Sequence, residues 1–137
     1  MFSATFRYAL ISLLEIAASD GGINATDIAR RHQISAPYLA NVLSDLRRLG
    51  LIKSQKGRRG GYQLLRQPQD INLFLLQQGL AGSPPVLAAT APHPALQWLD
   101  AFEQRCQAEL AATNLQELSA LIQGEHAQPQ IHAEPQS

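Results

Sequence analysis

Six positively charged side chains fall within residues 47–59, a segment without a single acid, and two glycines and a tyrosine follow at 60–62. Glycines permit positive φ and close backbone approach in a tight hairpin. The short apolar segments 51–52 and 62–65 on either side can supply its two strands. A solvated charge run is the plainer interpretation, but it does not explain the spacing of the glycines. The chemistry that the pattern predicts is neutralisation of nucleic-acid phosphates by the Lys and Arg side chains of a hairpin loop.

Charge is divided unequally along the chain, although the formal net charge is zero. Residues 1–66 hold ten of the eleven Lys and Arg residues against four acids, whereas residues 67–137 hold one Arg against seven acids. Because electrostatic attraction depends on the local field, the first half is suited to bind phosphates and the second half is not. The chain of 137 residues has room for one small domain and an appendage, and so small a core would gain from dimerisation.

Several classes of protein are disfavoured by the composition. The first residues lack the continuous apolar core and cleavage site of a signal peptide, and prolines interrupt the uncharged segment 71–99, so we expect neither secretion nor a membrane span. Cys106 is the only cysteine, which excludes an intrachain disulfide and suits a reducing cytoplasm. We find no phosphate-binding loop, no paired zinc-type histidines and no nucleophile elbow, and we expect no enzymatic activity.

Three helices are predicted before the hairpin. Apolar residues recur at helical spacing over 6–17. A capping asparagine opens a second, short helix over 24–32, and a capping serine opens a third over 35–49, with Pro37 in its first turn. A short helix, a tight turn and a helix with a polar start make a helix-turn-helix, to which the hairpin 51–65 adds a wing.

The rest of the chain is predicted to form helices joined by a loop. Asn72 can cap a helix that continues to residue 80 and is apolar on nearly all sides, so we expect this helix to be buried. A proline-rich loop over 82–94 leads into a long helix from residue 95. One stripe of this helix is apolar, and packing against a twofold mate would cover it. The predicted dimer interface consists of Leu96, Leu99, Phe102, Cys106 and Leu110.

The predicted fold class is therefore mainly α: a winged helix-turn-helix with a two-stranded β wing, plus a long C-terminal dimerisation helix. We place the winged helix-turn-helix, a DNA-binding domain, over residues 1–81. The loop and dimerisation helix follow over 82–123, with a short final helix over 115–122. A polar tail over 124–137 is expected to be disordered.

Three segments carry a family resemblance: residues 7–10 (RYAL), 34–39 (ISAPYL) and 50–62 (GLIKSQKGRRGGY). With them the chain resembles the Rrf family of bacterial winged-helix transcriptional regulators, closely over residues 5–81 and only loosely in the C-terminal helix. The resemblance implies a homodimeric transcription factor, usually a repressor, that binds a pseudo-palindromic operator in double-stranded DNA. It also implies that such a regulator often senses iron, nitric oxide or thiol status.

The resemblance assigns expected roles to individual residues. Ser35, Tyr38 and Asn41 lie at the exposed start of the recognition helix, where relatives contact phosphates and base edges. Lys56 takes the wing position at which many relatives place an arginine in the minor groove, and Ala40 stands where some relatives carry a base-reading glutamate. With the phosphate-neutralising cations included, the predicted DNA-binding residues are Arg7, Ser35, Tyr38, Asn41, Arg47, Arg48, Lys53, Lys56, Arg58 and Arg59.

A sensor site is not apparent in the sequence. Cluster-binding members of the family hold three cysteines between the fourth helix and the long helix, because iron in such clusters takes thiolate ligands. Residues 79–98 of this chain contain no cysteine. We therefore expect no iron–sulfur cluster of the family type, no other cofactor and no metal site. Cys106 is interpreted as a small apolar residue of a helix interface and His93 as a loop residue, and a sensing role for either stays open.

Two functions compete at this point. The favoured one is a homodimeric, sequence-specific DNA-binding transcriptional regulator in the cytoplasm, whose signal is a small molecule, a partner protein or nothing beyond its own concentration. The alternative is a winged-helix interaction module that acts through a partner protein, which the acidic second half and the uncharged segment 71–99 would suit. Selection of operators from random duplexes separates the two.

Overall fold

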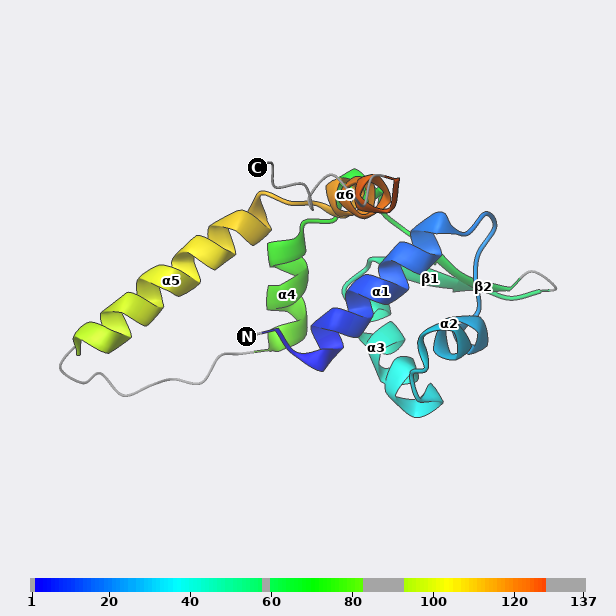
Figure 1. The fold of residues 1–137 in the computed structure, drawn as a ribbon. Helices are drawn as coiled ribbons and strands as arrows, with labels where there is room; N and C mark the ends of the chain where they lie inside the picture. Colours follow the sequence, from blue (N-terminus) through cyan, green and yellow to red (C-terminus); the bar gives the residue numbers. More distant parts are fainter. Residues whose placement is uncertain (1, 58–59, 83–92, 128–137) are drawn as a thin grey trace.

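The structure is a computed structural model of the chain that describes residues 2–57, 60–82 and 93–127. Its elements follow one another along the chain as drawn in Figure 1. They are α1 (Ala4–Ala18), α2 (Ala25–His32), α3 (Ala36–Arg48), β1 (Ile52–Gln55), β2 (Gly61–Leu64), a 3₁₀ helix η1 (Pro68–Asp70), α4 (Leu73–Ala81), α5 (Pro94–Ala111) and α6 (Leu115–Ala127). The predicted class, mainly helical with a two-stranded wing, is confirmed.

Capping side chains open the first three helices, and for α2 and α3 they are the predicted ones. Ser3, Asn24 and Ser35 each accept a hydrogen bond from the backbone N–H three residues further on, which satisfies one of the unpaired donors of a helix start. Gly50, which follows the C-cap Leu49 of α3, adopts a φ of 76°. A left-handed residue at this position turns the chain out of the helix and towards the wing.

One hydrophobic core joins the helix-turn-helix to the wing and to the C-terminal half. The side chains at its centre come from six parts of the chain: Leu13 of α1, Ile28 of α2, Leu39, Leu43 and Leu46 of α3, Ile52 of β1, Ile71 before α4, and Leu115 of α6. Because Leu115 is completely buried, α6 belongs to the same folded body as the first three helices.

The wing is an antiparallel hairpin in which Ile52 pairs with Leu64. A third segment joins it, because Ile23, between α1 and α2, forms a β bridge with Tyr62. The Tyr62 N–H donates to the carbonyl of Ile23 at 2.7 Å. Gly61 permits this approach, since a Cβ at that position would lie 2.5 Å from the carbonyl oxygen of Ile23. The glycine spacing noted in the sequence thus fixes the base of the wing against the helices.

Two expectations for the C-terminal half are corrected by the structure. Leu73 and Leu76 of α4 are buried, but Leu75 is 64% exposed, because α4 packs on the core from one side only. Helix α6 continues to Ala127, so residues 124–127 are helical where the sequence predicted a disordered tail. The remainder of that tail, residues 128–137, and most of the proline-rich loop, residues 83–92, lie outside the described residues. No helix in the described part of the chain is long and apolar enough to cross a membrane.

Candidate nucleic-acid interface

The first half of α3 presents a polar face to solvent. Ser35, which caps the helix, and Asn41 in its second turn are both exposed, as is Ala40. Leu39 and Val42 on the opposite side are buried in the core. This burial fixes the rotation of α3 about its own axis, so that the exposed face is open to a DNA groove of suitable width.

Tyr38 links the start of α3 to α1. Its side chain is half-buried, its hydroxyl lies 3.1 Å from the hydroxyl of Thr5, and its ring packs edge-on against Tyr8 with a centroid distance of 5.4 Å. Such an edge-to-face pair is a favourable aromatic geometry. The structure therefore gives Tyr38 a packing role, and the phosphate contact expected of it stays a prediction.

The predicted cations of the helical part lie at exposed positions. Arg7 of α1 is exposed, and its Nε donates to the backbone carbonyl of Phe2 at 3.3 Å. Arg47 and Arg48 are exposed in the last turn of α3, and Arg48 pairs with Asp45 at 3.2 Å. Exposed pairs one helical turn apart contribute little and are easily exchanged for other partners.

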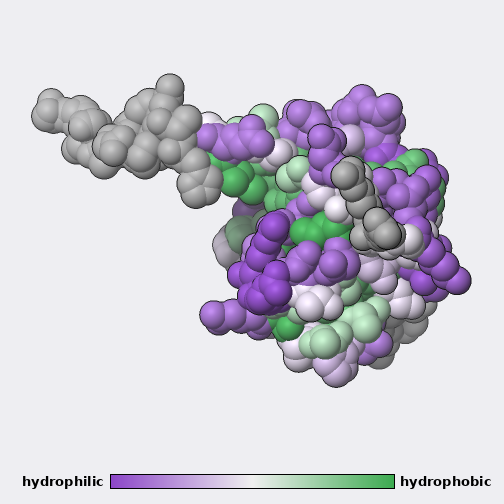
Figure 2. All heavy atoms as spheres, turned by 90° about the vertical axis from the view of Figure 1, so that its right-hand side faces the viewer, coloured by the Kyte–Doolittle hydropathy of each residue, from purple (hydrophilic) through white to green (hydrophobic). Residues whose placement is uncertain are grey.

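The wing carries the other predicted cations. Lys53 lies on β1 and Lys56 just beyond it, and both are exposed. Arg58 and Arg59, the remaining two, lie outside the described residues. Figure 2 shows the molecule from the wing side, where hydrophilic side chains predominate. The structure thus brings polar and cationic groups of α3 and the wing onto one body, and it does not test their contacts with DNA.

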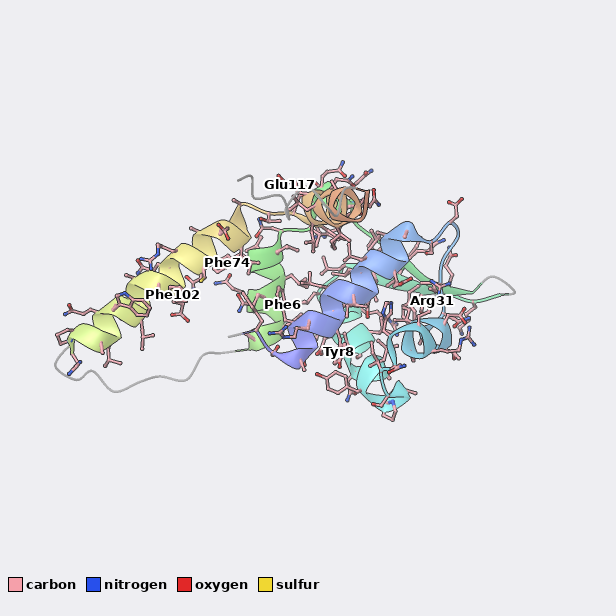
Figure 3. All side chains as sticks on the ribbon, in the orientation of Figure 1. Phe6, Tyr8, Arg31, Phe74, Phe102 and Glu117 are labelled. Carbon is pink, nitrogen blue, oxygen red and sulfur yellow. The ribbon has the colours of Figure 1, made fainter. Side chains whose placement is uncertain are left out.

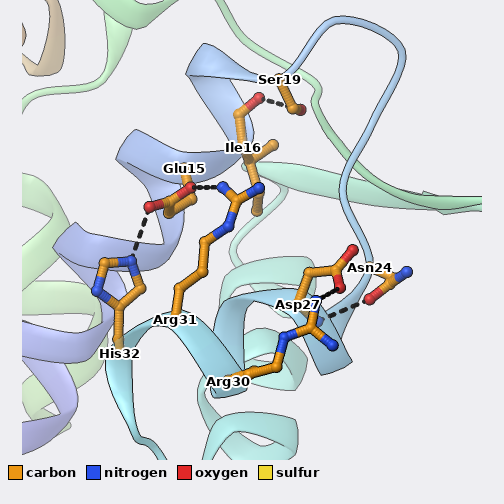
Figure 4. Close-up of polar contacts among 8 residues, drawn as sticks. All are labelled: Glu15, Ile16, Ser19, Asn24, Asp27, Arg30, Arg31 and His32. Carbon is orange, nitrogen blue, oxygen red and sulfur yellow. Dashed lines mark hydrogen bonds and ion pairs between the residues drawn. The ribbon is translucent and has the colours of Figure 1, made fainter.

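A carboxylate of α1 holds α2 in place, as Figure 4 shows. Glu15 accepts a hydrogen bond from Nη1 of Arg31 at 2.8 Å and lies 2.7 Å from Nε2 of His32. Burial by itself would raise the pKa of Glu15, but the hydrogen bonds and positive charges of His32 and Arg31 outweigh it and hold the pKa below its usual value. This contact was not predicted from the sequence, because no spacing rule joins residues sixteen and seventeen positions apart.

We expect Glu15→Gln to lower the free energy of unfolding by about 1–2 kcal/mol at neutral pH, since the amide loses the charge that pairs with Arg31 and keeps only one of the two acceptor oxygens. The pKa of Glu15 is lower in the folded protein than in the unfolded chain. Its contribution is therefore complete above the usual glutamate pKa of about 4.3 and is lost as the pH falls through the folded-state value. Urea unfolding of both proteins between about pH 7 and pH 3 measures this, with Asp27→Asn as control. A wild-type advantage that persists unchanged at the acid end would contradict the assignment.

Helix α5 carries the predicted dimer stripe, and none of its residues is buried. Figure 3 shows Phe102 on α5, to the side of the winged-helix body. Cys106 and Leu110 are partly covered. The larger apolar side chains lie open in the single chain, with exposed fractions of 50% for Leu96, 51% for Leu99, 60% for Trp98 and 38% for Phe102. Exposed apolar surface of this kind is typical of interaction sites, and the dimer interface stays a prediction.

The two residues considered as sensors have structural positions. His93 lies in the loop directly before α5 and is the N-cap of that helix, since its Nδ1 accepts a hydrogen bond from the N–H of Ala95 at 3.0 Å. Cys106 lines a cavity of about 320 Å³ between α5, Phe2 and Gln77. Among the described residues, no group of three or more His, Cys, Asp and Glu side chains is placed to hold a metal ion.

The Rrf2 family, described as iron-dependent transcriptional regulators, matches residues 2–121. The chain belongs to the Rrf2 family. A regulator of Rhodobacter capsulatus described as rrf2-like is 34% identical to it over 102 residues, which are 69% of this chain and 68% of that protein. The regulator IscR of Aliivibrio salmonicida is 40% identical over 67 residues, or 47% of this chain. The chain spans about half the length of several such curated relatives, 52% for a regulator of Aquifex aeolicus and 40% for this IscR.

Solved structures of transcriptional regulators resemble the chain over most of its length. CymR, the global cysteine regulator of B. subtilis, aligns with a TM-score of 0.74 and 30% identity over 88% of this chain and 97% of its own. IscR of T. potens aligns with a TM-score of 0.77 and 27% identity over 93% and 90%. The likeness includes the C-terminal half, which the sequence resemblance covers only loosely.

Proposed function

We propose that this Rrf2 protein is a homodimeric, sequence-specific DNA-binding repressor of transcription, and not an enzyme, that acts in the cytoplasm. The observation that carries the proposal is the exposed polar face of α3 on the same body as a wing bearing Lys53 and Lys56. Winged helices use these two parts together: the helix enters the major groove, and cationic side chains of the wing neutralise phosphates.

The exposed apolar face of α5 supports the dimer. A twofold pair would cover this face and place two copies of α3 on one side of the duplex, about one or two helical turns apart. The operator would then be pseudo-palindromic, each half-site being read by one copy.

Selection of operators from a pool of random duplexes tests the proposal. Enrichment of a twofold-symmetric motif is expected, and a promoter carrying that motif should be less active in cells that express the protein. A pool that yields no palindrome would favour the alternative, an interaction module that acts through a partner protein.

The same proposal includes regulation without an iron–sulfur cluster of the family type. A set of three cysteine ligands does not fit a chain whose only cysteine is Cys106, although the family is described as iron-dependent. A small molecule, a partner protein or the protein's own concentration would then supply the signal. Spectra and iron analysis of protein purified without oxygen test this. A colourless, iron-free dimer that binds its operator is expected, and stoichiometric iron would contradict the proposal.

We expect Asn41→Ala to change the preference among operator variants by about 1–3 kcal/mol at one base position, because a bidentate amide contact to a base edge contributes that much discrimination. Competition between single-base operator variants measures the change. Ser44→Ala, an exposed change one turn along the same helix, serves as the comparison. Equal weakening on every operator would show that Asn41 does not read a base.

Replacing both Lys53 and Lys56 by alanine should weaken binding to all sequences nearly equally. Each phosphate contact that is lost removes about 0.9 from the slope of log K against log salt, so the slope should fall by up to about two units. Titrations at several salt concentrations measure the slope. If it stays the same, the wing does not contact the DNA backbone through these two residues.

A further inference from the structure

The chain between α5 and α6 is joined to the start of α4 by two backbone hydrogen bonds. The N–H of Leu73 donates to the carbonyl of Thr113 at 3.1 Å, and the N–H of Leu115 donates to the carbonyl of Ile71 at 2.9 Å. The side chains of Ile71 and Leu115 are buried in the core, so this junction is part of the rigid body. We call it the α4–α5 corner, which consists of residues 71–73 and 111–115.

The side chain of Asn72 makes bonds to both helices of the corner. Its Oδ1 accepts hydrogen bonds from the N–H groups of Phe74 and Leu75 at 3.0 and 3.1 Å, which caps α4. Its Nδ2 donates to the carbonyl of Ala111, the last residue of α5, at 2.7 Å. The carbonyl groups at a helix end carry partial negative charge and lack partners within the helix. The side-chain amide of Asn72 therefore caps both the beginning of α4 and the end of α5.

Beyond the corner, α5 contacts the body mainly through α4, and Leu110 near the end of α5 is half-buried against the core. Helix α5 has no fully buried residue, and a cavity of about 320 Å³ separates part of it from Phe2 and Gln77. Figure 1 shows α5 leaving the corner and running away from α4. The direction of α5 relative to the winged helix therefore depends on the contacts at the corner together with the packing of α5 against α4.

A small change in that direction would move the far end of α5 by a distance that matters on DNA. The helix has 18 residues and is about 27 Å long at about 1.5 Å per residue. A tilt of about 7° at the corner displaces its other end by roughly 3.4 Å, the rise of one base pair. Because α5 carries the apolar stripe, its direction would set the separation of the two α3 helices in a dimer.

We propose that Asn72 is a positioning residue that determines which half-site spacing the dimer accepts. The proposal rests on the dimeric operator binding proposed above. It adds the element that holds the two α3 helices of the dimer at a fixed separation. Asn72 itself touches no DNA in this arrangement, since its side chain is occupied at the corner.

Asn72→Asp separates the two roles of the side chain. Aspartate is an equally good helix cap, but it replaces the donor to Ala111 by an oxygen that repels the carbonyl. Asn114→Asp is the matched control in the same corner: Asn114 accepts a hydrogen bond from the N–H of Glu117 at 2.8 Å, which aspartate preserves. Binding of the full chain is measured on operators whose half-sites are moved apart or together by one base pair.

Wild type and Asn114→Asp should strongly prefer one spacing. In Asn72→Asp the preference for that spacing over its neighbours should fall by roughly five-fold or more, the value of one lost hydrogen bond, while the dimer and the affinity for a single half-site stay unchanged. Serine at position 72 can cap α4 with its hydroxyl but is too short to reach Ala111. Asn72→Ser should therefore show the same loss of preference for one half-site spacing, and it replaces Asn72→Asp in the experiment if the aspartate variant folds poorly.

An unchanged spacing profile in a folded Asn72 variant would overturn the proposal. A wild-type protein that binds DNA with no spacing preference, or does not bind it, would instead overturn the dimeric operator binding on which the proposal rests.

Discussion

Phe102→Glu should convert the protein to monomers and lower its affinity for a full operator by about 10²–10⁴-fold, the usual gain from linking two binding modules. Phe102 lies in the middle of the predicted stripe, stacked on Trp98 with a centroid distance of 5.4 Å. In a dimer its ring would be covered by the partner, and an unpaired carboxylate in that position would be strongly unfavourable. The residue makes no contribution to the buried core of the single chain, so the domain should remain folded.

Sedimentation equilibrium and operator binding measure the two consequences separately. Gln104→Glu is the matched control, because it places the same charge at an exposed position of α5 outside the stripe. It should remain a dimer with nearly wild-type affinity. The affinity of Phe102→Glu for an isolated half-site should also be retained, since α3 and the wing are untouched. A Phe102→Glu protein that stays dimeric would place the interface elsewhere.

The N-terminal half of the fold could be predicted because local rules determine it. Asn24 and Ser35 cap their helices within the next three residues, and Gly50 ends α3 through its own backbone conformation. The exposure of Asn41 follows from helical spacing once Leu39 and Val42 are assigned to the core. Each of these inferences uses contacts between residues close in sequence, which a pattern can record.

The contacts that were not predicted from the sequence are tertiary. Glu15 meets Arg31 and His32 only because α1 and α2 cross, and Asn72 was predicted as a cap without any sign of its bond to Ala111, 39 residues away. Leu75 was expected in the core, yet the number of sides on which α4 is covered depends on neighbours that its own sequence does not specify. The base sequence that α3 would recognise cannot be predicted for the same reason, because it depends on how the helix lies in the DNA groove as well as on the residues of the helix.

Gly61→Ala should destabilise the domain by about 2–4 kcal/mol, the largest effect on stability that we expect from a single methyl group. The added Cβ would lie 2.5 Å from the carbonyl oxygen of Ile23 and 2.6 Å from its carbonyl carbon. Both are backbone atoms of the bridge to Tyr62, so relief requires that the α1–α2 connection and the wing separate. The wing would then lose its fixed position beside α3. The affinity for the operator should therefore fall even at temperatures at which the variant is still folded.

Gly124→Ala is the control for this change. Gly124 lies within α6, where an added Cβ meets nothing within 4 Å, and the same substitution there should stabilise the protein by up to about 1 kcal/mol because alanine favours the helix. Thermal and urea unfolding of the three proteins should therefore place the two variants on opposite sides of wild type. If Gly61→Ala were as stable as wild type and bound its operator normally, the close contact between Ile23 and the wing could not be what holds the hairpin to the recognition helix.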